Sequence, residues 1–341
     1  MPIIHGENLR SVLESSTAPC SSSGSSMTAV LVADIKCLLG ECVVYDDRTD
    51  SIKFTDIYQK QFHELCLTPS PLGYGMTSFD LPKQLCAFGL LSSETHDENC
   101  YLCAWEDGFQ LYNIKTNSPL SDMSSGENVI PLGAPTRLND GRCDRSGRRF
   151  ICGGFYGDVK GNTMKVFQCM LSEKNKTSLQ HCELISVDAA DLEVTNSICF
   201  SPDGSTMYFA DSPKRKIFEY NYVEESGRCS NKRVLYQASV GVPDGSCVDK
   251  EGFIWNAAWR SGYGTGRVNR IDPSSGKIVF TVLLPDATSQ ASCCCLGGKN
   301  FDILFISTAS VDRDIDKEPN AGGLYAVKVP FIGLKESRFS C

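Results

Sequence analysis

The chain has 341 residues, a formal net charge of −8 and 18 cysteines. A chain of this length accommodates one large all-β domain or two ordinary domains, and its core needs no disulfides to be stable. The basic residues are scattered along the sequence, whereas nucleic-acid binding requires a clustered positive face. No apolar run is long enough to span a membrane. We therefore expect neither a nucleic-acid partner nor insertion into a membrane.

The first 27 residues are rich in serine and show no periodicity, which predicts a disordered tail. They lack a basic segment followed by an apolar one, the pattern of a secretory signal. Glu7 and Glu14 are atypical of a transit peptide, which is poor in acidic residues. We expect a cytoplasmic protein, and organelle targeting by the tail stays open. In that setting the cysteines are expected to be buried free thiols.

Short turn clusters followed by β-rich segments recur along the rest of the chain. The clusters begin at residues 46, 97, 144, 201, 249 and 297. Hairpins joined by Gly- and Asp-rich turns and repeated at this spacing are typical of propeller blades. We predict an all-β fold, a six-bladed β-propeller with four-stranded blades over residues 28–335, followed by a short C-terminal tail at 336–341. The strand expected at 29–32 precedes the first unit and should pair with the last blade, which removes an open sheet edge.

One polar position recurs at the same place in the repeat. Counting back five residues from the turn clusters gives Glu41, Ser92, Asn139, Asn196, Asp244 and Ser292. Equivalent positions on the innermost strands of a propeller meet around the central channel. Four of the six are carboxylates or carboxamides, whose hard oxygens suit Ca²⁺, Mg²⁺ or Mn²⁺. Asn-Asp-Gly and Pro-Asp-Gly sequences also form turns, but because four such residues recur in register we favour a metal site.

Several short motifs occur in a fixed order along the chain. They include Leu-Gly-Glu at 39–41, Arg-Leu-Asn-Asp-Gly at 137–141, Thr-Asn-Ser at 195–197 and Val-Pro-Asp-Gly at 242–245. In order and spacing, these motifs resemble the family of senescence marker protein (regucalcin), gluconolactonase and luciferin-regenerating enzyme. The resemblance implies a metal-dependent lactonase with one divalent ion, Ca²⁺ first and Mg²⁺, Mn²⁺ or Zn²⁺ as alternatives.

The resemblance also implies roles for individual residues. Glu41, Asn196 and Asp244 would bind the ion, and Asp244 would also be the general base. Arg137 and Asn139 would contact the substrate.

Two segments depart from the family's pattern. Gly-Gly-Phe-Tyr at 153–156 stands where many relatives have a small polar segment with a substrate-binding acid, and the segment 259–266 looks several residues longer than usual. Both should border the pocket. We add Phe155 and Tyr156 as candidate substrate contacts that would favour a less polar ring.

Three hypotheses about function remain. The first is hydrolysis of a small lactone, with a metal ion polarising the carbonyl and a carboxylate accepting a proton. The second is hydrolysis of another ester, such as an organophosphate, at the same metal site. The third is a calcium-binding or protein-interaction propeller without catalysis. The implied ligand set Glu41, Asn196 and Asp244 favours the first two, with a small-molecule substrate and a monomeric protein.

Overall fold

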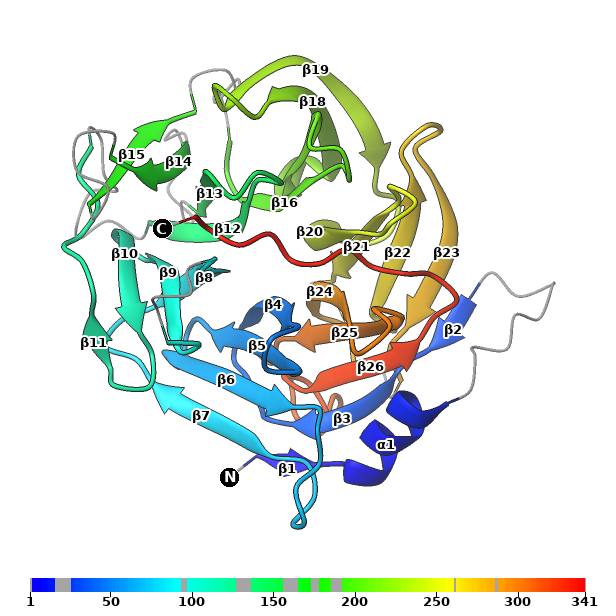
Figure 1. The fold of residues 1–341 in the computed structure, drawn as a ribbon. Coiled ribbons are helices and arrows are strands. Elements are labelled where there is room, and N and C mark those ends of the chain that lie inside the picture. The colour runs from blue at the N-terminus through cyan, green and yellow to red at the C-terminus, as the bar shows by residue number, and fades with distance from the viewer. Residues whose placement is uncertain are drawn as a thin grey trace.

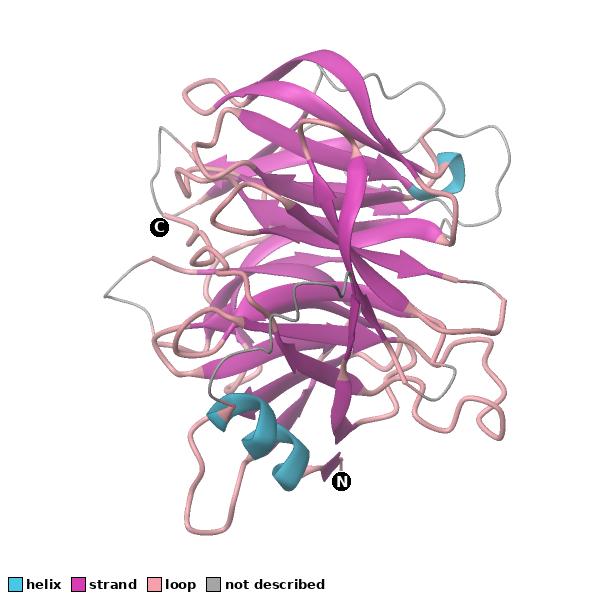
Figure 2. Cartoon of the chain, turned by 90° about the vertical axis from the view of Figure 1, so that its right-hand side faces the viewer, coloured by secondary structure: helices cyan, strands magenta, loops and turns pink. Residues whose placement is uncertain are grey.

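The structure is a computed structural model that describes residues 2–15, 26–92, 97–126, 136–155, 165–172, 178–184, 192–260, 262–285 and 288–340. Within these residues, six sheets, each built on four antiparallel strands, stand around a common axis (Figure 1). Figure 2 shows the same blades from the side, where strands dominate. In the part of the chain that the structure describes, helix is confined to two short segments. The predicted six-bladed β-propeller with four-stranded blades is confirmed.

The blades follow one another in chain order, each written here from its innermost strand outwards. The first three are β4 (Gly40–Asp46), β5 (Ser51–Asp56), β6 (Gln61–Cys66) and β7 (Met76–Asp80); β8 (Leu85–Leu90), β9 (Cys100–Trp105), β10 (Gly108–Asn113) and β11 (Ser118–Pro119); and β12 (Arg137–Cys143), β13 (Phe150–Phe155), β14 (Val166–Leu171) and β15 (Leu179–Glu183). The last three are β16 (Thr195–Phe200), β17 (Thr206–Asp211), β18 (Lys216–Val223) and β19 (Arg228–Gln237); β20 (Val242–Val248), β21 (Ile254–Trp259), β22 (Arg267–Asp272) and β23 (Lys277–Leu283); and β24 (Ala291–Gly297), β25 (Ile303–Thr308), β26 (Leu324–Lys328) and β3 (Val30–Asp34).

The last blade closes the ring with a strand from the N-terminal part of the chain. β3 pairs with β26 in antiparallel register, with Tyr325 opposite Leu31. This confirms the pairing expected for residues 29–32. A further strand, β2 (Ser26–Thr28), runs parallel to β23 at the edge of the fifth blade.

The N-terminal residues 3–14 are folded, unlike the disordered tail predicted there. β1 (Ile3–Ile4) pairs with β3, and the helix α1 (Gly6–Glu14) buries Leu9 and Val12. These two side chains lie three residues apart on one helix face and belong to an apolar cluster shared with the first and last blades. The predicted tail was wrong here because tertiary packing stabilises so short a helix. Residues 16–25 lie outside the described part of the chain, and no described helix is long and apolar enough to cross a membrane.

Buried apolar side chains fill the spaces between blades. The strand β24 illustrates this, since Cys293 and Cys295 pack into one apolar cluster and Cys294 into another. Side chains of neighbouring strand residues point to opposite faces. The packing role expected for these thiols is therefore confirmed, and of the described cysteines only Cys182 is exposed.

Each innermost strand carries a β-bulge at the same level. The residues at or beside these bulges are Glu41, Cys86, Asn139, Asn196, Asp244 and Ser292. A bulge bends the strand and redirects a side chain, and here it recurs where the polar ring was predicted. In the second blade the predicted position, Ser92, is wrong. Ser92 lies beyond the end of β8 because the segment after that strand is longer than in the other blades, and Cys86 occupies the equivalent place.

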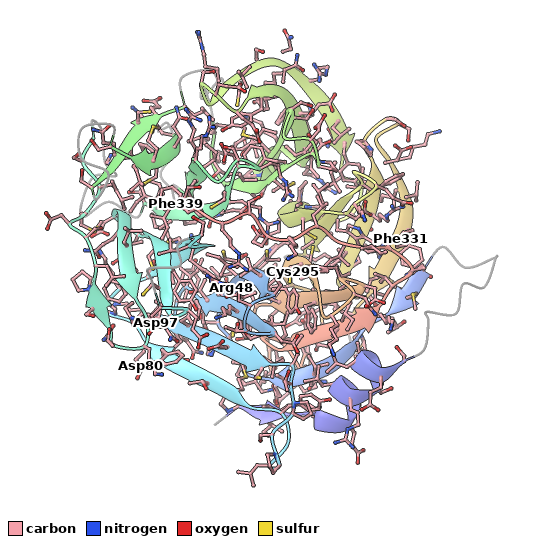
Figure 3. The ribbon with its side chains drawn as sticks, viewed as in Figure 1. Arg48, Asp80, Asp97, Cys295, Phe331 and Phe339 are labelled. Carbon is pink, nitrogen blue, oxygen red and sulfur yellow. The ribbon has the colours of Figure 1, made fainter. Side chains whose placement is uncertain are left out.

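The C-terminal segment, defined here as residues 331–340, crosses one end of the central channel. Figure 1 shows it in red across the middle of the ring, and Figure 3 shows Phe331 and Phe339 on opposite sides of the centre. Glu336 pairs with Arg142 at 3.5 Å, and Phe339 is fully buried. Residues 336–340, predicted to be a tail, are thus docked on the propeller, and they leave a cavity of only about 30 Å³ at that end.

Candidate active site

The other end of the channel is an open cavity of about 330 Å³. This volume suits a small organic molecule. All the predicted site residues that the structure describes line it, namely Glu41, Arg137, Asn139, Phe155, Asn196 and Asp244. Tyr156, the remaining candidate, lies outside the described residues.

The two motifs that could have formed turns lie within strands. Asn139, Asp140 and Gly141 belong to β12, and Asp244 and Gly245 belong to β20. A Cβ atom on Gly245 would lie 2.6 Å from the Sγ of Cys293. Glycine therefore follows Asp244 because the neighbouring blade packs against the backbone there.

A chain of hydrogen bonds connects the third, fourth and fifth blades at the floor of the cavity. Asn139 Nδ2 donates to Asn196 Oδ1 at 2.9 Å and to the carbonyl oxygen of Thr195 at 2.8 Å. Asn196 Nδ2 donates to Ser212 Oγ at 2.8 Å, and this hydroxyl donates to the carbonyl oxygen of Pro243 at 2.6 Å. The network fixes the orientation of the Asn196 carboxamide, whose oxygen keeps a second lone pair for a ligand.

A second group of polar side chains holds the backbone of Asp244. Ser197 Oγ donates to the Asp244 carbonyl oxygen at 2.7 Å, and Asn256 Nδ2 donates to the same oxygen at 3.0 Å. The sequence analysis missed Asn256 and Ser212 as supporting residues. Asn256 also donates to Ser197 Oγ at 2.9 Å, and Ser212 donates to Pro243, so each joins the fourth and fifth blades. No local pattern indicates such contacts, although Ser197 lies in the Thr-Asn-Ser motif.

Two carboxyl groups of the cavity interact electrostatically with each other and with the buried Asp140. Burial raises the pKa of Glu41 to about 8, and the nearby Asp140 carboxylate adds to the rise. Burial raises the pKa of Asp244 well above its ordinary value, with Glu41 and Asp140 adding to it. The Arg137 guanidinium acts in the opposite direction on both groups. The one arginine only partly offsets the burial and the mutual repulsion that disfavour the charged forms of these carboxyl groups.

These residues fit a divalent cation. Glu41, Asn196 and Asp244 supply hard oxygen donors, and a cation among them would stabilise the charged carboxylates against the burial and repulsion that raise their pKa values. In the described residues no three His, Cys, Asp or Glu side chains are grouped closely enough to hold a metal. A site here therefore depends on the carboxamide of Asn196.

Arg137 is held between aromatic rings rather than in solvent. Its guanidinium carbon lies 4.8 Å from the ring centre of Phe155 and 5.6 Å from that of Tyr58. Its Nη1 donates to Asn139 Oδ1 at 2.5 Å and to the carbonyl oxygen of Leu138 at 3.0 Å. Burial and these contacts give the side chain one orientation, with its charge at the cavity wall.

The remaining cavity wall is mostly apolar. It includes Leu39, Val194, Pro213, Val242, Trp259 and Val311. Trp259 ends β21 and begins the segment 259–266, so the expectation that this segment borders the pocket is confirmed for Trp259. Phe155 confirms the same expectation for the segment 153–156.

The protein is a six-bladed β-propeller in which oxygen donors converge at one mouth of the central channel. Residues 39–310 match the family model described as "SMP-30/Gluconolactonase/LRE-like region". The chain belongs to this family.

Curated relatives match over most of their length. The chain is 34% identical to regucalcin of Xenopus laevis over 308 residues, which cover 87% of this chain and 92% of the relative. It is 32% identical to L-arabinolactonase of Azospirillum brasilense over 321 residues, which cover 92% and 95%. The crystal structure of a calcium-binding protein, regucalcin, from Agrobacterium tumefaciens has the same fold, with a TM-score of 0.75, 24% identity and coverage of 92% and 98%.

Proposed function

We propose that this protein is a divalent-metal-dependent hydrolase that opens a small lactone. The observation that carries the proposal is the convergence of Glu41, Asn196 and Asp244 in one cavity beside Arg137. Membership of a family that includes gluconolactonase, and similarity to an arabinolactonase, support hydrolysis of a lactone.

Glu41, Asn196 and Asp244 would hold the ion, with Ca²⁺ as the first candidate and Mg²⁺, Mn²⁺ and Zn²⁺ as alternatives. Oxygen donors from carboxylates and a carboxamide are those that hard cations prefer. When bound, a divalent ion supplies Lewis acidity that polarises a carbonyl and makes water more acidic.

The chain's own residues would perform the remaining steps. A carboxylate oxygen of Asp244 accepts a proton from the attacking water as its oxygen bonds to the lactone carbonyl carbon. The bond to the ring oxygen breaks, the ring oxygen takes up a proton, and a hydroxy acid results. Arg137 and Asn139 hold the substrate ring, and Arg137 does so with a guanidinium already fixed by Phe155.

The test is hydrolysis of a panel of lactones, aryl esters and phosphotriesters by metal-stripped protein and by protein reloaded with each ion. We expect turnover of lactones that requires metal and is lost in Glu41→Gln. Preferential turnover of phosphotriesters would replace this proposal with the second hypothesis. Metal binding without turnover of any ester would favour a non-catalytic calcium-binding propeller.

A further inference from the structure

The entrance of the cavity is built from apolar side chains that retain accessible surface. Phe155, Val194, Val242, Trp259 and Val311 are half-buried, so part of each remains available to a ligand. Burying such surface is favourable in proportion to its area.

These side chains form an apolar wall to which separate parts of the ring contribute. Trp259 and Val311 pack against the same apolar cluster, which includes Leu39. Trp259 stands on the fifth blade and Leu39 precedes the first, so the wall spans separate parts of the ring. Across the cavity, Phe155 presents its ring beside Arg137.

Two of the polar side chains near this wall, Asn139 and Ser212, already use their donor hydrogens. Both hydrogens of the Asn139 amide are used, on Asn196 and Thr195, and its oxygen accepts from Arg137. The single hydroxyl hydrogen of Ser212 goes to a backbone carbonyl. A polyhydroxylated ring entering here could reach the hydroxyl of Tyr58 and the carboxylate of Asp312, whereas the rest of this wall is apolar and offers its other hydroxyl groups no partner. Each hydroxyl buried without a partner lowers affinity by about tenfold or more.

We propose that the cavity takes a lactone whose ring carries an alkyl or aryl substituent, and that Trp259 determines this preference. The inference rests on the proposed lactonase function and specifies its substrate class. The carbonyl lies among Glu41, Asn196 and Asp244, the ring lies beside Arg137, and the substituent covers the wall at Trp259. A hydroxylated sugar lactone lacks the surface to cover this wall.

The first experiment compares kcat/KM of the metal-loaded protein on two substrate series. One is a set of γ-lactones with substituents from methyl to hexyl, and the other is a set of sugar γ- and δ-lactones. We expect kcat/KM to rise about fourfold per added CH₂ over the first few carbons and to exceed that of the sugar lactones.

Two variants locate the preference. Trp259→Ala should lower kcat/KM for hexyl-substituted lactone at least about tenfold more than for unsubstituted γ-butyrolactone, mainly through KM, whereas Trp259→Phe should recover most of this difference. Leu72→Ala is the matched control, because Leu72 is almost fully exposed at 99% and lies outside the cavity. Equal losses on both substrates in Trp259→Ala would overturn the role of Trp259.

A binding measurement separates this inference from the proposed function. The chain has three tryptophans, and Trp105 and Trp255 are fully buried, so intrinsic fluorescence should report on Trp259. The probe is 2-hexylcyclopentanone, a lactone analogue without a scissile bond. The change in protein fluorescence that its binding causes should vanish in Trp259→Phe.

Each pattern of results decides a different question. Faster turnover of sugar lactones than of alkyl lactones overturns the substrate class and leaves the lactonase intact. Absence of turnover on both series, with the ketone still bound at Trp259, overturns the lactonase assignment and upholds the apolar preference of the cavity.

Discussion

Glu41 and Asp46 lie at opposite ends of the same strand, β4, and the pKa values of their carboxyl groups shift in opposite directions. Burial raises the pKa of Glu41 to about 8 at the open mouth. Burial acts in the same sense on Asp46 at the closed end, but hydrogen bonds from Arg48 and Arg338 and the charge of Lys53 lower its pKa to about 2. The same strand thus carries a carboxylate paired with cations at one end and a carboxyl group without a cation of its own at the other.

The difference follows from what covers each end. In the C-terminal segment, Arg338 forms an ion pair with Asp46 at 2.9 Å and Glu336 forms one with Arg142 at 3.5 Å. The buried charges at the closed end are therefore paired. No segment in the described residues brings an equivalent cation to Glu41 and Asp244, which share the single nearby guanidinium of Arg137. A carboxylate kept without its own partner destabilises the fold locally and is available to a cation.

The largest expected effect is at the open mouth, in Asp244→Asn. The substitution keeps the shape and one oxygen but removes the basic charge, and general-base contributions are about a hundred- to ten-thousand-fold. We expect kcat on the best lactone to fall by at least that lower factor at saturating metal. Asp316→Asn, on the exposed surface, is the control and should stay within about twofold. Near-normal kcat in Asp244→Asn would mean that the base lies elsewhere.

The next effect tests the closed end, through Phe339→Ala. Phe339 is fully buried, and its backbone N–H donates to the Leu90 carbonyl oxygen at 2.7 Å. Truncating a buried phenylalanine typically costs about 3–5 kcal/mol, so the free energy of unfolding, measured with urea, should fall by about that range. Lactonase kinetics at 25 °C should change little while the protein stays folded. An unchanged free energy of unfolding would show that the C-terminal segment is not docked in solution.

Glu41→Gln tests whether the carboxyl group of Glu41 makes the stability of the protein depend on pH. Because folding raises the pKa of Glu41 from 4.5 to about 8, the folded state binds more protons than the unfolded state between these values. The metal-stripped protein should therefore lose stability as pH rises from about 5 to 8. The Tm of metal-stripped Glu41→Gln should fall less over the same range, and the variant should bind metal more weakly. Parallel Tm curves for the two proteins would argue against a raised pKa of Glu41 in the folded state.

The two ends also differ in how far the sequence predicted them. The turn clusters are local signals, so they predicted the six blades. Counting back five residues from each cluster also predicted the ring of polar positions that contains Glu41, Asn196 and Asp244. The count failed at Ser92, where a longer segment displaces the turn. Docking of Phe339 was missed because its partners on β8 lie far away in sequence. Local patterns reveal a repeated position, whereas contacts between blades appear only after folding.

The smallest expected effect concerns Arg137, which connects the charge of the open mouth with its apolar wall. If Arg137 only holds the substrate, Arg137→Ala should raise KM about tenfold or more and change kcat little. Arg137→Lys should recover only part of this, because an ammonium group does not stack between Phe155 and Tyr58 as a planar guanidinium does.

Removing the guanidinium also removes a charge that lowers the pKa values of Glu41 and Asp244. In Arg137→Ala the acidic limb of the kcat/KM profile should therefore move to higher pH, and in Arg137→Lys it should stay near its original position. A fall in kcat at unchanged KM would instead place Arg137 at the reacting atoms. The measurement is steady-state kinetics from pH 5 to 9 at saturating metal.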